Sequence, residues 1–572
     1  MKHPLTLFAL VCGLALHVRA APRPNILILL VDDQGYGDFS CHGNPILKTP
    51  NLDRLHDECI RFTDFHVAPM CSPTRGQLMS GMDALRNGAT SVTAGRSFVR
   101  PGIPTMPEIF AGFGYRTGIF GKWHLGDNYP HRPIDKGFQD AVWLKGWGLT
   151  SAPEFTNTHF DGRCYRGVTE THFKGYITDF CFDEAMKWMR ERAAKKEPFL
   201  CYLPLNAVHA PLVVAEKYSV PYQGKVGPKV AKFFGMIANV DENVARLESF
   251  LRETGLRDDT ILIFMTDNGG TAGVKTFNAG LRGQKTEYYE GGHRVPCWVR
   301  WPAGKLRPPG DLDMPTQIQD LLPTLVGLAG TRSQLDFKSR VDGISLAGLL
   351  QGSTNPLPDR LLVVQYGQIP RKWDSCVIWN QWRLVKGEEL YDVHADRAQE
   401  HDVATQHKDV VEKMRAQYEK WWASIEPRLN DFVTISLGAE QANPVQLTSS
   451  DWEAVWADNS GHIDRGAGGP RGGPWNVFVE REGEYEISLR RWPPDLDLPL
   501  AATRGKDGKA LPIRAARLAI GDQSLSLKSD ANAKVAVFHA RLPRGKTQLR
   551  AWFQDETGHD LCGAYYATVT RQ

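Results

Sequence analysis

The sequence predicts an α/β fold with a mostly parallel central sheet covered by helices on both faces. Segments with helical spacing separate several apolar runs, and strands that alternate with helices favour a parallel sheet. One such helix is expected to begin at Thr49-Pro50, with apolar residues at 52, 55 and 59. The apolar runs are typical of strands buried on both faces, and they lie at Asn25–Val31, Thr117–Phe120, Phe199–Leu203 and Ile261–Met265.

Each of these predicted strands is followed by polar residues. They are Asp32 and Asp33 after the first strand, Lys122 and His124 after the second, Asn206 and His209 after the third, and Asp267 and Asn268 after the fourth. Parallel strands of one sheet bind ligands beyond their carboxyl ends. We therefore expect all these side chains to converge on one site.

The composition is that of an exported globular protein. The 572 residues, 42% hydrophobic and 23% charged, suit two or three domains, and a net charge of +3 gives no sign of a nucleic-acid partner. Residues 1–20 predict a signal peptide, with Lys2, an apolar stretch over 5–16, and cleavage after Ala20. No later stretch is apolar enough for membrane insertion. The mature chain is expected to be periplasmic or secreted if the source is bacterial.

The chain has ten cysteines, of which Cys12 belongs to the predicted signal peptide. Apart from Cys71, the others are scattered without the short paired spacings of zinc sites. One or two disulfides are compatible with an oxidising compartment.

The run CSPTR at residues 71–75 is the most specific local pattern. Pro73 suits the first turn of a helix, which places Cys71 where free N–H groups and the helix dipole attract an anion. Arg75 lies one turn further along the same side. A cysteine in such a place is more often a buried or paired thiol, so the pattern needs support from the rest of the chain.

That support comes from a family resemblance. The run resembles the Cys-x-Pro-x-Arg signature of type I (formylglycine-dependent) sulfatases, which are arylsulfatase-like members of the alkaline phosphatase superfamily. The similarity covers about residues 24–425 and includes further blocks in family order at 31–38 (VDDQGYGD), 49–55 (TPNLDRL), 121–126 (GKWHLG), 266–269 (TDNG) and 281–292 (LRGQKTEYYEGG). The resemblance implies the fold of that superfamily. It also implies that a formylglycine-generating enzyme oxidises Cys71 during maturation.

The residue types suggest a metal site. Asp32, Asp33, Asp267 and Asn268 offer only oxygen ligands, which suit a hard divalent cation better than zinc. Turn and cap roles would explain either pair alone. Three carboxylates at one site would repel one another unless a cation neutralised them. By resemblance the cation is Ca²⁺, alternatively Mg²⁺, and residue 71 completes its shell.

The resemblance also implies roles in hydrolysis. Asp267 is the candidate base for the attacking hydroxyl, and His209 is the candidate acid for the leaving alcohol. His124 would orient the formylglycine diol. Arg75, Lys122 and Lys285 would stabilise charge on the sulfuryl oxygens. Outside the family blocks, the same residues would be interpreted as a structural histidine and solvated lysines.

Two further features lie beside these residues. His293 stands where the family usually has an aliphatic residue, and we interpret it as structural or pocket-lining. The loop at residues 126–133 follows the block that contains His124. It is a candidate contact for the leaving group of the substrate, although such residues are also ordinary turn formers.

The pattern changes after the expected catalytic domain, residues 21–330. Residues 331–430 resemble the small sheet-and-helix subdomain of sulfatases, with a hairpin from Cys376–Trp379 and Trp382–Val385 and an amphipathic helix over 408–422. Short alternating strands then predict a β-sandwich over 431–572, in which Trp475–Val479 and Tyr485–Leu489 form a hairpin. This domain would bind a sulfated glycan, or it would stabilise the enzyme or shape its pocket.

The leading hypothesis is a sulfatase that acts on sulfate esters. Export and family habit point to a sulfated carbohydrate as the substrate. One alternative is a phosphatase, phosphodiesterase or phosphonate hydrolase of the same superfamily, but these normally use a serine or threonine nucleophile and often zinc. Another is a non-catalytic secreted glycan-binding protein, which would tolerate the loss of metal ligands; none is missing here.

Overall fold

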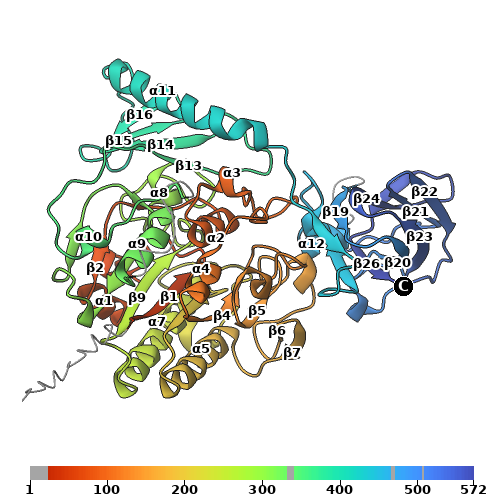
Figure 1. Cartoon of the computed structure of the whole chain (residues 1–572), viewed down its shortest axis with the longest axis horizontal. Helices are drawn as coiled ribbons and strands as arrows, with labels where there is room; N and C mark the ends of the chain where they lie inside the picture. Colours follow the sequence, from red (N-terminus) through yellow and green to blue (C-terminus); the bar gives the residue numbers. More distant parts are fainter. Residues whose placement is uncertain (1–22, 331–340, 466–470, 506–507) are drawn as a thin grey trace, which may run out of the picture.

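The computed structural model describes residues 23–330, 341–465, 471–505 and 508–572 (Figure 1). The predicted signal peptide, residues 1–20, lies outside these ranges. The described chain forms a large α/β domain, a small antiparallel sheet with one long helix, and a C-terminal pair of mostly antiparallel sheets. The predicted fold class is confirmed.

The large domain is built on a ten-stranded sheet with the order β11-β2-β10-β9-β1-β8-β4-β5-β6-β7. The four predicted strands are its consecutive parallel centre: β9 (Thr260–Thr266), β1 (Asn25–Val31), β8 (Phe199–Pro204) and β4 (Arg116–Lys122). β5 (Asp140–Leu144) is parallel to β4. The outer strands are β10 (Cys297–Arg300), β2 (Ile60–Phe62), β11 (Gly310–Leu312), β6 (Arg163–Arg166) and β7 (Thr169–His172). Because the central four are parallel neighbours, their carboxyl ends lie along one edge of the sheet.

Helices cover both faces of this sheet. The alternation of side chains along β1 sends Ile26, Ile28 and Leu30 into one apolar cluster and Leu27, Leu29 and Val31 into the other. The first cluster is closed by α2 (Cys71–Ser80), α4 (Met106–Gly112), α9 (Leu321–Leu328) and α10 (Ala347–Leu350). The second is closed by α1 (Pro50–Asp57), α5 (Ile177–Ala194) and α7 (Pro228–Glu253).

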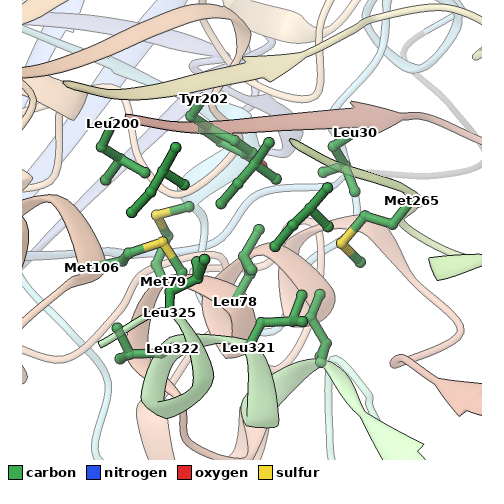
Figure 2. Packing of buried hydrophobic residues seen from close by; sticks show 14 of the residues in the cluster. Leu30, Leu78, Met79, Met106, Leu200, Tyr202, Met265, Leu321, Leu322 and Leu325 are labelled. Atoms are coloured by element: carbon green, nitrogen blue, oxygen red, sulfur yellow. The ribbon is translucent and has the colours of Figure 1, made fainter. Parts of the chain in front are cut away.

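Helix α2 is held between the sheet and α9. Figure 2 shows Leu78 and Met79 of α2 between the sheet residues, such as Leu30, and the leucines of α9. All ten residues of α2 are buried, and the helix ends at Gly81, whose φ of 66° is left-handed. The helix begins at Cys71, as the position of Pro73 predicts. Packing on both sides therefore fixes the position of Cys71.

The small sheet consists of β13 (Leu362–Gln365), β14 (Ser375–Trp379), β15 (Trp382–Val385) and β16 (Glu389–Asp392), all antiparallel. The hairpin predicted around Asn380 is confirmed, because β14 pairs with β15. Helix α11 (Lys408–Ile425) covers one face with a buried stripe that includes Met414 and Tyr418.

The C-terminal domain contains two sheets that share one apolar core. One has the order β17-β19-β24-β21-β22, with β25 beside β24, and the other has the order β18-β26-β20-β23. Their bounds are β17 (Ile435–Leu437), β18 (Val445–Thr448), β19 (Trp475–Val479), β20 (Gly483–Arg490), β21 (Ala515–Ile520), β22 (Gln523–Lys528), β23 (Ala536–Leu542), β24 (Gly545–Gln554), β25 (Asp560–Gly563) and β26 (Tyr566–Arg571).

The hairpin predicted from Trp475–Val479 and Tyr485–Leu489 is wrong. β19 pairs with β17 and β24, whereas β20 pairs with β23 and β26 in the other sheet. Val477 of β19 and Ile487 of β20 both point into the common core. Burial of both apolar faces against each other outweighs local pairing of two neighbouring strands.

Two expectations about the whole chain can be compared with the structure. Every cysteine of the described ranges is a free thiol, so the disulfides allowed by the sequence do not occur there. Within the same ranges, no helix has the length and apolar composition needed to cross a bilayer.

Candidate active site

A pocket of about 560 Å³ opens beyond the carboxyl ends of the central strands. Cys71, His124, His209 and Lys285 line it within the large domain. Loop residues 366–369 of the small subdomain form a second wall. Trp456, Asp458 and Asn459 of the C-terminal domain form a third. All three parts of the molecule therefore contribute to one pocket, of a size typical of ligand sites.

The Cys71 thiol lies within reach of three predicted site residues. Its Sγ is 3.4 Å from Lys285 Nζ, 3.4 Å from Asn268 Oδ1 and 3.6 Å from Asp32 Oδ1. Burial, and next the charge of Asp32, raise the pKa of this thiol well above its usual value. The unmodified side chain is therefore a neutral thiol and a poor nucleophile.

Arg75 and Lys122 hold the carboxylates behind the pocket. Arg75 Nη2 donates to Asp32 Oδ2 at 2.9 Å and to Asp267 Oδ2 at 2.8 Å, and its Nη1 donates to the Lys122 carbonyl at 2.9 Å. Lys122 Nζ also donates to Asp32 Oδ2. Burial alone would raise the pKa of Asp32, but Lys122 and other neighbouring cations hold it well below its usual range.

Asp33 makes the hydrogen bonds on the other side of the site. Its Oδ1 accepts from Lys285 Nζ at 2.5 Å and from Asn268 Nδ2 at 2.9 Å, and its N–H donates to Asp267 Oδ1 at 3.2 Å. Asp33 has a φ of 61°, which is uncommon outside glycine. Burial, and next the charge of Asp32, raise the pKa of Asp267 to about 6.

The charge balance corrects one step of the sequence argument. The three carboxylates of Asp32, Asp33 and Asp267 are not uncompensated, because Arg75, Lys122 and Lys285 bind all three. Repulsion among them is therefore no reason by itself to require a metal. The remaining argument is the donor set. Asp32, Asp33, Cys71 and His209 each offer a ligand atom within 4.8 Å of one another, with the Asn268 oxygen beside Cys71.

This donor set fits a hard cation. Asp32, Asp33 and Asn268 direct oxygens toward the group around Cys71, and oxygen ligands suit Ca²⁺ or Mg²⁺. Asp267 differs, because one of its oxygens accepts from Asp33 and the other from Arg75. It therefore lies at the edge of the group in this arrangement.

His124 lies at the wall of the pocket and is almost fully buried. Its Nε2 is 3.1 Å from the Val92 carbonyl, and its Nδ1 is buried with no hydrogen-bond partner among the described residues. Burial, and next Lys122 and Arg75, hold the pKa of His124 well below its usual value. The ring is therefore neutral and has one unused nitrogen.

His209 lines the same pocket. Its Nδ1 lies 2.6 Å from the Ala210 carbonyl, and its Nε2 lies 3.8 Å from Asp33 Oδ2. Burial lowers the pKa of His209 to about 4, although the charge of Asp33 opposes the shift. The carbonyl contact fixes the ring and leaves Nε2 on the side of the carboxylates.

The structure shows where His293 and the loop at residues 126–133 lie. His293 lies outside the pocket, with its Nδ1 2.9 Å from Nδ1 of His66, so its place is structural. The loop at residues 126–133 packs on the C-terminal domain: Asn128 donates to the Gln446 carbonyl at 2.9 Å, and His131 Nε2 is 3.0 Å from the Thr434 carbonyl. This loop is not part of the pocket at Cys71.

Sequence reasoning missed the aromatic walls, above all Trp147 and Trp456. Trp147 had a local signal, because it stands between two glycines. Gly148 has a φ of 108°, and a Cβ there would lie 1.8 Å from Asn206 Oδ1. Glycine is therefore required to bring Trp147 beside His209, where the ring centroids are 5.2 Å apart. Trp456 had no local signal.

Comparisons with known proteins identify the family of the chain. The family model described as "Sulfatase" matches residues 24–331. N-acetylgalactosamine-6-sulfatase of Rattus norvegicus is 29% identical over 412 residues, covering 66% of this chain and 77% of the relative. Arylsulfatase G of the same species is 28% identical, covering 58% and 70%.

Solved structures give a similar result. A crystal structure of Ps i-CgsB in complex with k-i-k-neocarrahexaose has a TM-score of 0.64 and 27% identity, and the match covers 70% of this chain and 92% of that one. The phosphonate monoester hydrolase of Agrobacterium radiobacter, at 19% identity and a TM-score of 0.52, shares the fold alone. With its converging site residues and a family match over more than half its length, the chain belongs to the sulfatase family, within the alkaline phosphatase-like superfamily of hydrolases, and is a sulfuric ester hydrolase.

Proposed function

We propose that this protein is an exported sulfatase that removes sulfate from a carbohydrate, with formylglycine at residue 71 and a bound Ca²⁺ or Mg²⁺. The observation that carries the proposal is the position of Cys71. It is the first residue of a buried helix at the base of the pocket, beside Lys285, Asn268 and Asp32. Burial raises the pKa of its thiol, so the unmodified side chain is a poor nucleophile and oxidation to formylglycine would supply a better one.

Formylglycine would supply, as its hydrate, two hydroxyls on one carbon, one to attack sulfur and one to release the sulfate afterwards. Cys71 is only 1% exposed, and all of α2 is buried. The formylglycine-generating enzyme therefore has to reach this segment before the domain has folded. Bound Ca²⁺ or Mg²⁺ would lower the pKa of the attacking hydroxyl, with Asp32, Asp33, Asp267, Asn268 and residue 71 as its ligands.

The three cationic side chains of the site differ in whether the substrate can contact them. Lys285 lines the pocket, so its ammonium can contact a sulfuryl oxygen directly. Arg75 and Lys122 are fully buried, and the Arg75 guanidinium already donates to Asp32, Asp267 and a carbonyl. These two residues act through their charge and by holding the carboxylates. His124 would use its unpaired Nδ1 to orient the diol.

Two residues would transfer protons. Asp267 would receive the proton of the attacking hydroxyl, and burial with the charge of Asp32, which raise its pKa, favour this role. His209 would donate from Nε2 to the leaving alcohol. Its pKa of about 4 applies without substrate, and the negative charge of a sulfate ester beside the ring would raise it toward the working range.

The carbohydrate assignment is supported by the relatives, one named for N-acetylgalactosamine-6-sulfate and another solved with a neocarrahexaose. Residues 21–330 would form the catalytic domain and 331–430 a subdomain that closes the pocket. Residues 431–572 would form the accessory domain. Export by the predicted signal peptide, residues 1–20, would bring the enzyme to extracellular or periplasmic polysaccharides.

One set of measurements tests this function. Peptide mass spectrometry of active protein should find formylglycine at residue 71. The mature protein should hydrolyse a phenyl sulfate far faster than the phosphate ester of the same phenol. It should also desulfate members of a panel that contains N-acetylgalactosamine 6-sulfate and carrageenan oligosaccharides. An unmodified thiol in active enzyme, or preference for the phosphate ester, would contradict the proposal.

A further inference from the structure

The C-terminal domain is joined to the catalytic domain next to the pocket. Residues 150–152 run beside residues 458–460: Ala152 N–H donates to the Asp458 carbonyl at 2.7 Å, and Ser151 pairs with Asn459 in an antiparallel bridge. Figure 1 shows the two domains in contact beside β5 and β6. Phe98, Ala152 and Phe155 of the catalytic domain also pack into the core of the C-terminal domain. The segment at 456–460 is therefore held against the active site from both sides.

Two tryptophans of this wall lie beside one carboxyl group. Trp456 Nε1 donates to Asp458 Oδ1 at 2.8 Å, and the Trp147 side chain approaches the same carboxyl group from the catalytic domain. Asp458 is only 4% exposed. The hydrogen bond to this buried acceptor fixes the orientation of the Trp456 ring at the domain boundary.

Trp456 is nevertheless 53% exposed, although Trp452, Trp475 and Trp492 of its domain are buried and Trp552 is half-buried. Its free surface lies in the pocket that contains Cys71, opposite the loop with Ile369, which is 61% exposed. A large apolar ring held rigidly and left open at a pocket marks a binding surface rather than a core position.

The position of the Trp456 surface relative to His209 indicates which part of the substrate would bind there. The proposed acid, His209, must lie beside the oxygen of the leaving alcohol. The ring centroid of Trp147 lies 5.2 Å from that of His209. The wall then continues through Asp458 to Trp456. The leaving alcohol, which is the rest of the saccharide, would therefore extend along this wall. The apolar C–H faces of pyranose rings pack on aromatic rings, and the Trp456 indole N–H is already satisfied by Asp458.

We propose that Trp456 of the C-terminal domain, together with Trp147, is the platform that binds the sugar of the substrate. Asp458 is the positioning residue that holds the Trp456 ring. The inference rests on the proposed function and deepens it. The accessory domain then determines specificity for sulfated saccharides over small sulfate esters, instead of serving only to stabilise the fold.

The test compares full-length matured wild type with Trp456→Ala, Trp456→Phe and the control Leu527→Ala. Leu527 is an exposed apolar residue of the same domain that does not line the pocket. Substrates are p-nitrophenyl sulfate and the panel saccharide that wild type hydrolyses best. Trp456→Ala should raise KM for the saccharide about tenfold more than KM for the aryl ester, with kcat for the saccharide much less affected. Trp456→Phe should recover most of the loss, and Leu527→Ala should change neither substrate.

Product inhibition gives an independent measurement. The desulfated saccharide should inhibit Trp456→Ala about tenfold more weakly than wild type, whereas inhibition by inorganic sulfate should change much less. Asp458→Ala should shift KM in the same direction as Trp456→Ala.

The outcomes separate the two proposals. In one outcome, wild type desulfates a panel saccharide, but Trp456→Ala has the same ratio of saccharide KM to aryl-ester KM and is inhibited equally by the desulfated saccharide. The platform is then wrong and the sulfatase function stands. If wild type hydrolyses the aryl sulfate and no saccharide, the carbohydrate assignment and the platform both fail. If it hydrolyses no sulfate ester, the whole proposed function fails with them.

Discussion

Two buried polar clusters among the described residues can be compared, and the first of them faces the pocket at Cys71 whereas the second does not. The active-site cluster consists of Asp32, Asp33, Arg75, Lys122, Asp267 and Lys285. The second cluster consists of Asp64, His66, Glu290, His293, Arg294 and Arg383, and none of these residues lines the pocket at Cys71. Both contain buried carboxylates held by cations, and both contribute to a group of potential metal ligands.

In the second cluster, the carboxylates of Asp64 and Glu290 are bound by arginines of the same cluster. Arg383 of β15 donates to both oxygens of Asp64, at 2.7 and 2.9 Å, and to Glu290 Oε1 at 2.7 Å. Glu290 also accepts from Arg294 at 3.0 Å. These pairs join the small subdomain to the catalytic domain. Buried charge and shifted pKa values therefore do not identify a catalytic centre; access to substrate and an unused donor or acceptor do.

The largest loss of activity is expected beside the active-site cluster, from Cys71→Ser. Serine offers a single hydroxyl and has no second one with which to release sulfate, so turnover should fall by about 10,000-fold or more. Steady-state hydrolysis of p-nitrophenyl sulfate measures this. Cys41→Ser, at a partly exposed cysteine outside the pocket, is the control and should keep its activity. Substantial turnover by Cys71→Ser would remove the need for formylglycine.

Asp267→Ala should cost metal and activity together. The variant loses an oxygen ligand and the candidate base, and turnover should fall about 1,000-fold. Elemental analysis of matured protein should find stoichiometric Ca²⁺ or Mg²⁺ in wild type and less in the variant. Asp259→Ala, at an exposed aspartate just before β9, should change neither quantity. Stoichiometric zinc, or fully active wild type without metal after chelation, would contradict the assigned site.

His209→Ala should damage hydrolysis of a sugar sulfate about 100-fold or more. The loss on p-nitrophenyl sulfate should be much smaller, because the nitrophenolate leaves without a proton. The ratio of kcat values on the two substrates is the measurement, with exposed His172→Ala as control. Equal losses on both substrates would mean that His209 binds sulfate or supports its loop, and Lys285 would be the next candidate acid.

Arg383→Met should affect stability rather than chemistry. It leaves the carboxylates of Asp64 and Glu290 buried without their main partner, which should destabilise the fold by about 3–5 kcal/mol. Denaturant unfolding measures the change. The control is Arg541→Met, an exposed residue paired with Glu482, which should cost far less because solvent screens the pair. Similar small losses in both variants would show that the second cluster does not hold the subdomain in place.

The smallest expected effect is a pH dependence of the second cluster. Burial alone would raise the pKa of Glu290, but Arg383 and the next neighbours lower it from 4.5 to about 2. The ionised group therefore stabilises the fold above pH 4.5, and this contribution is lost as the pH falls toward 2. Glu290→Gln should be less stable than wild type by about 1–3 kcal/mol at pH 7, and the difference should shrink below pH 4.5. A difference independent of pH would contradict the ion-pair interpretation.

The sequence by itself determined the centre of the fold and the set of residues brought together there. The four central strands were predictable because strands buried on both faces are continuous apolar runs, and Cys71 was predictable as a helix start because Pro73 restricts the local backbone. These features depend on neighbouring residues, which the sequence shows directly.

Only the tertiary structure decided which groups compensate one another and what encloses the pocket. The pairing of Asp32 with Lys122 joins residues far apart in the chain, as does the bond of Arg383 to Asp64. The strands β19 and β20 likewise follow the shared core instead of the short turn between them. The physical reason is that burial, charge compensation and access to solvent depend on distance in space, which no local pattern of residues records.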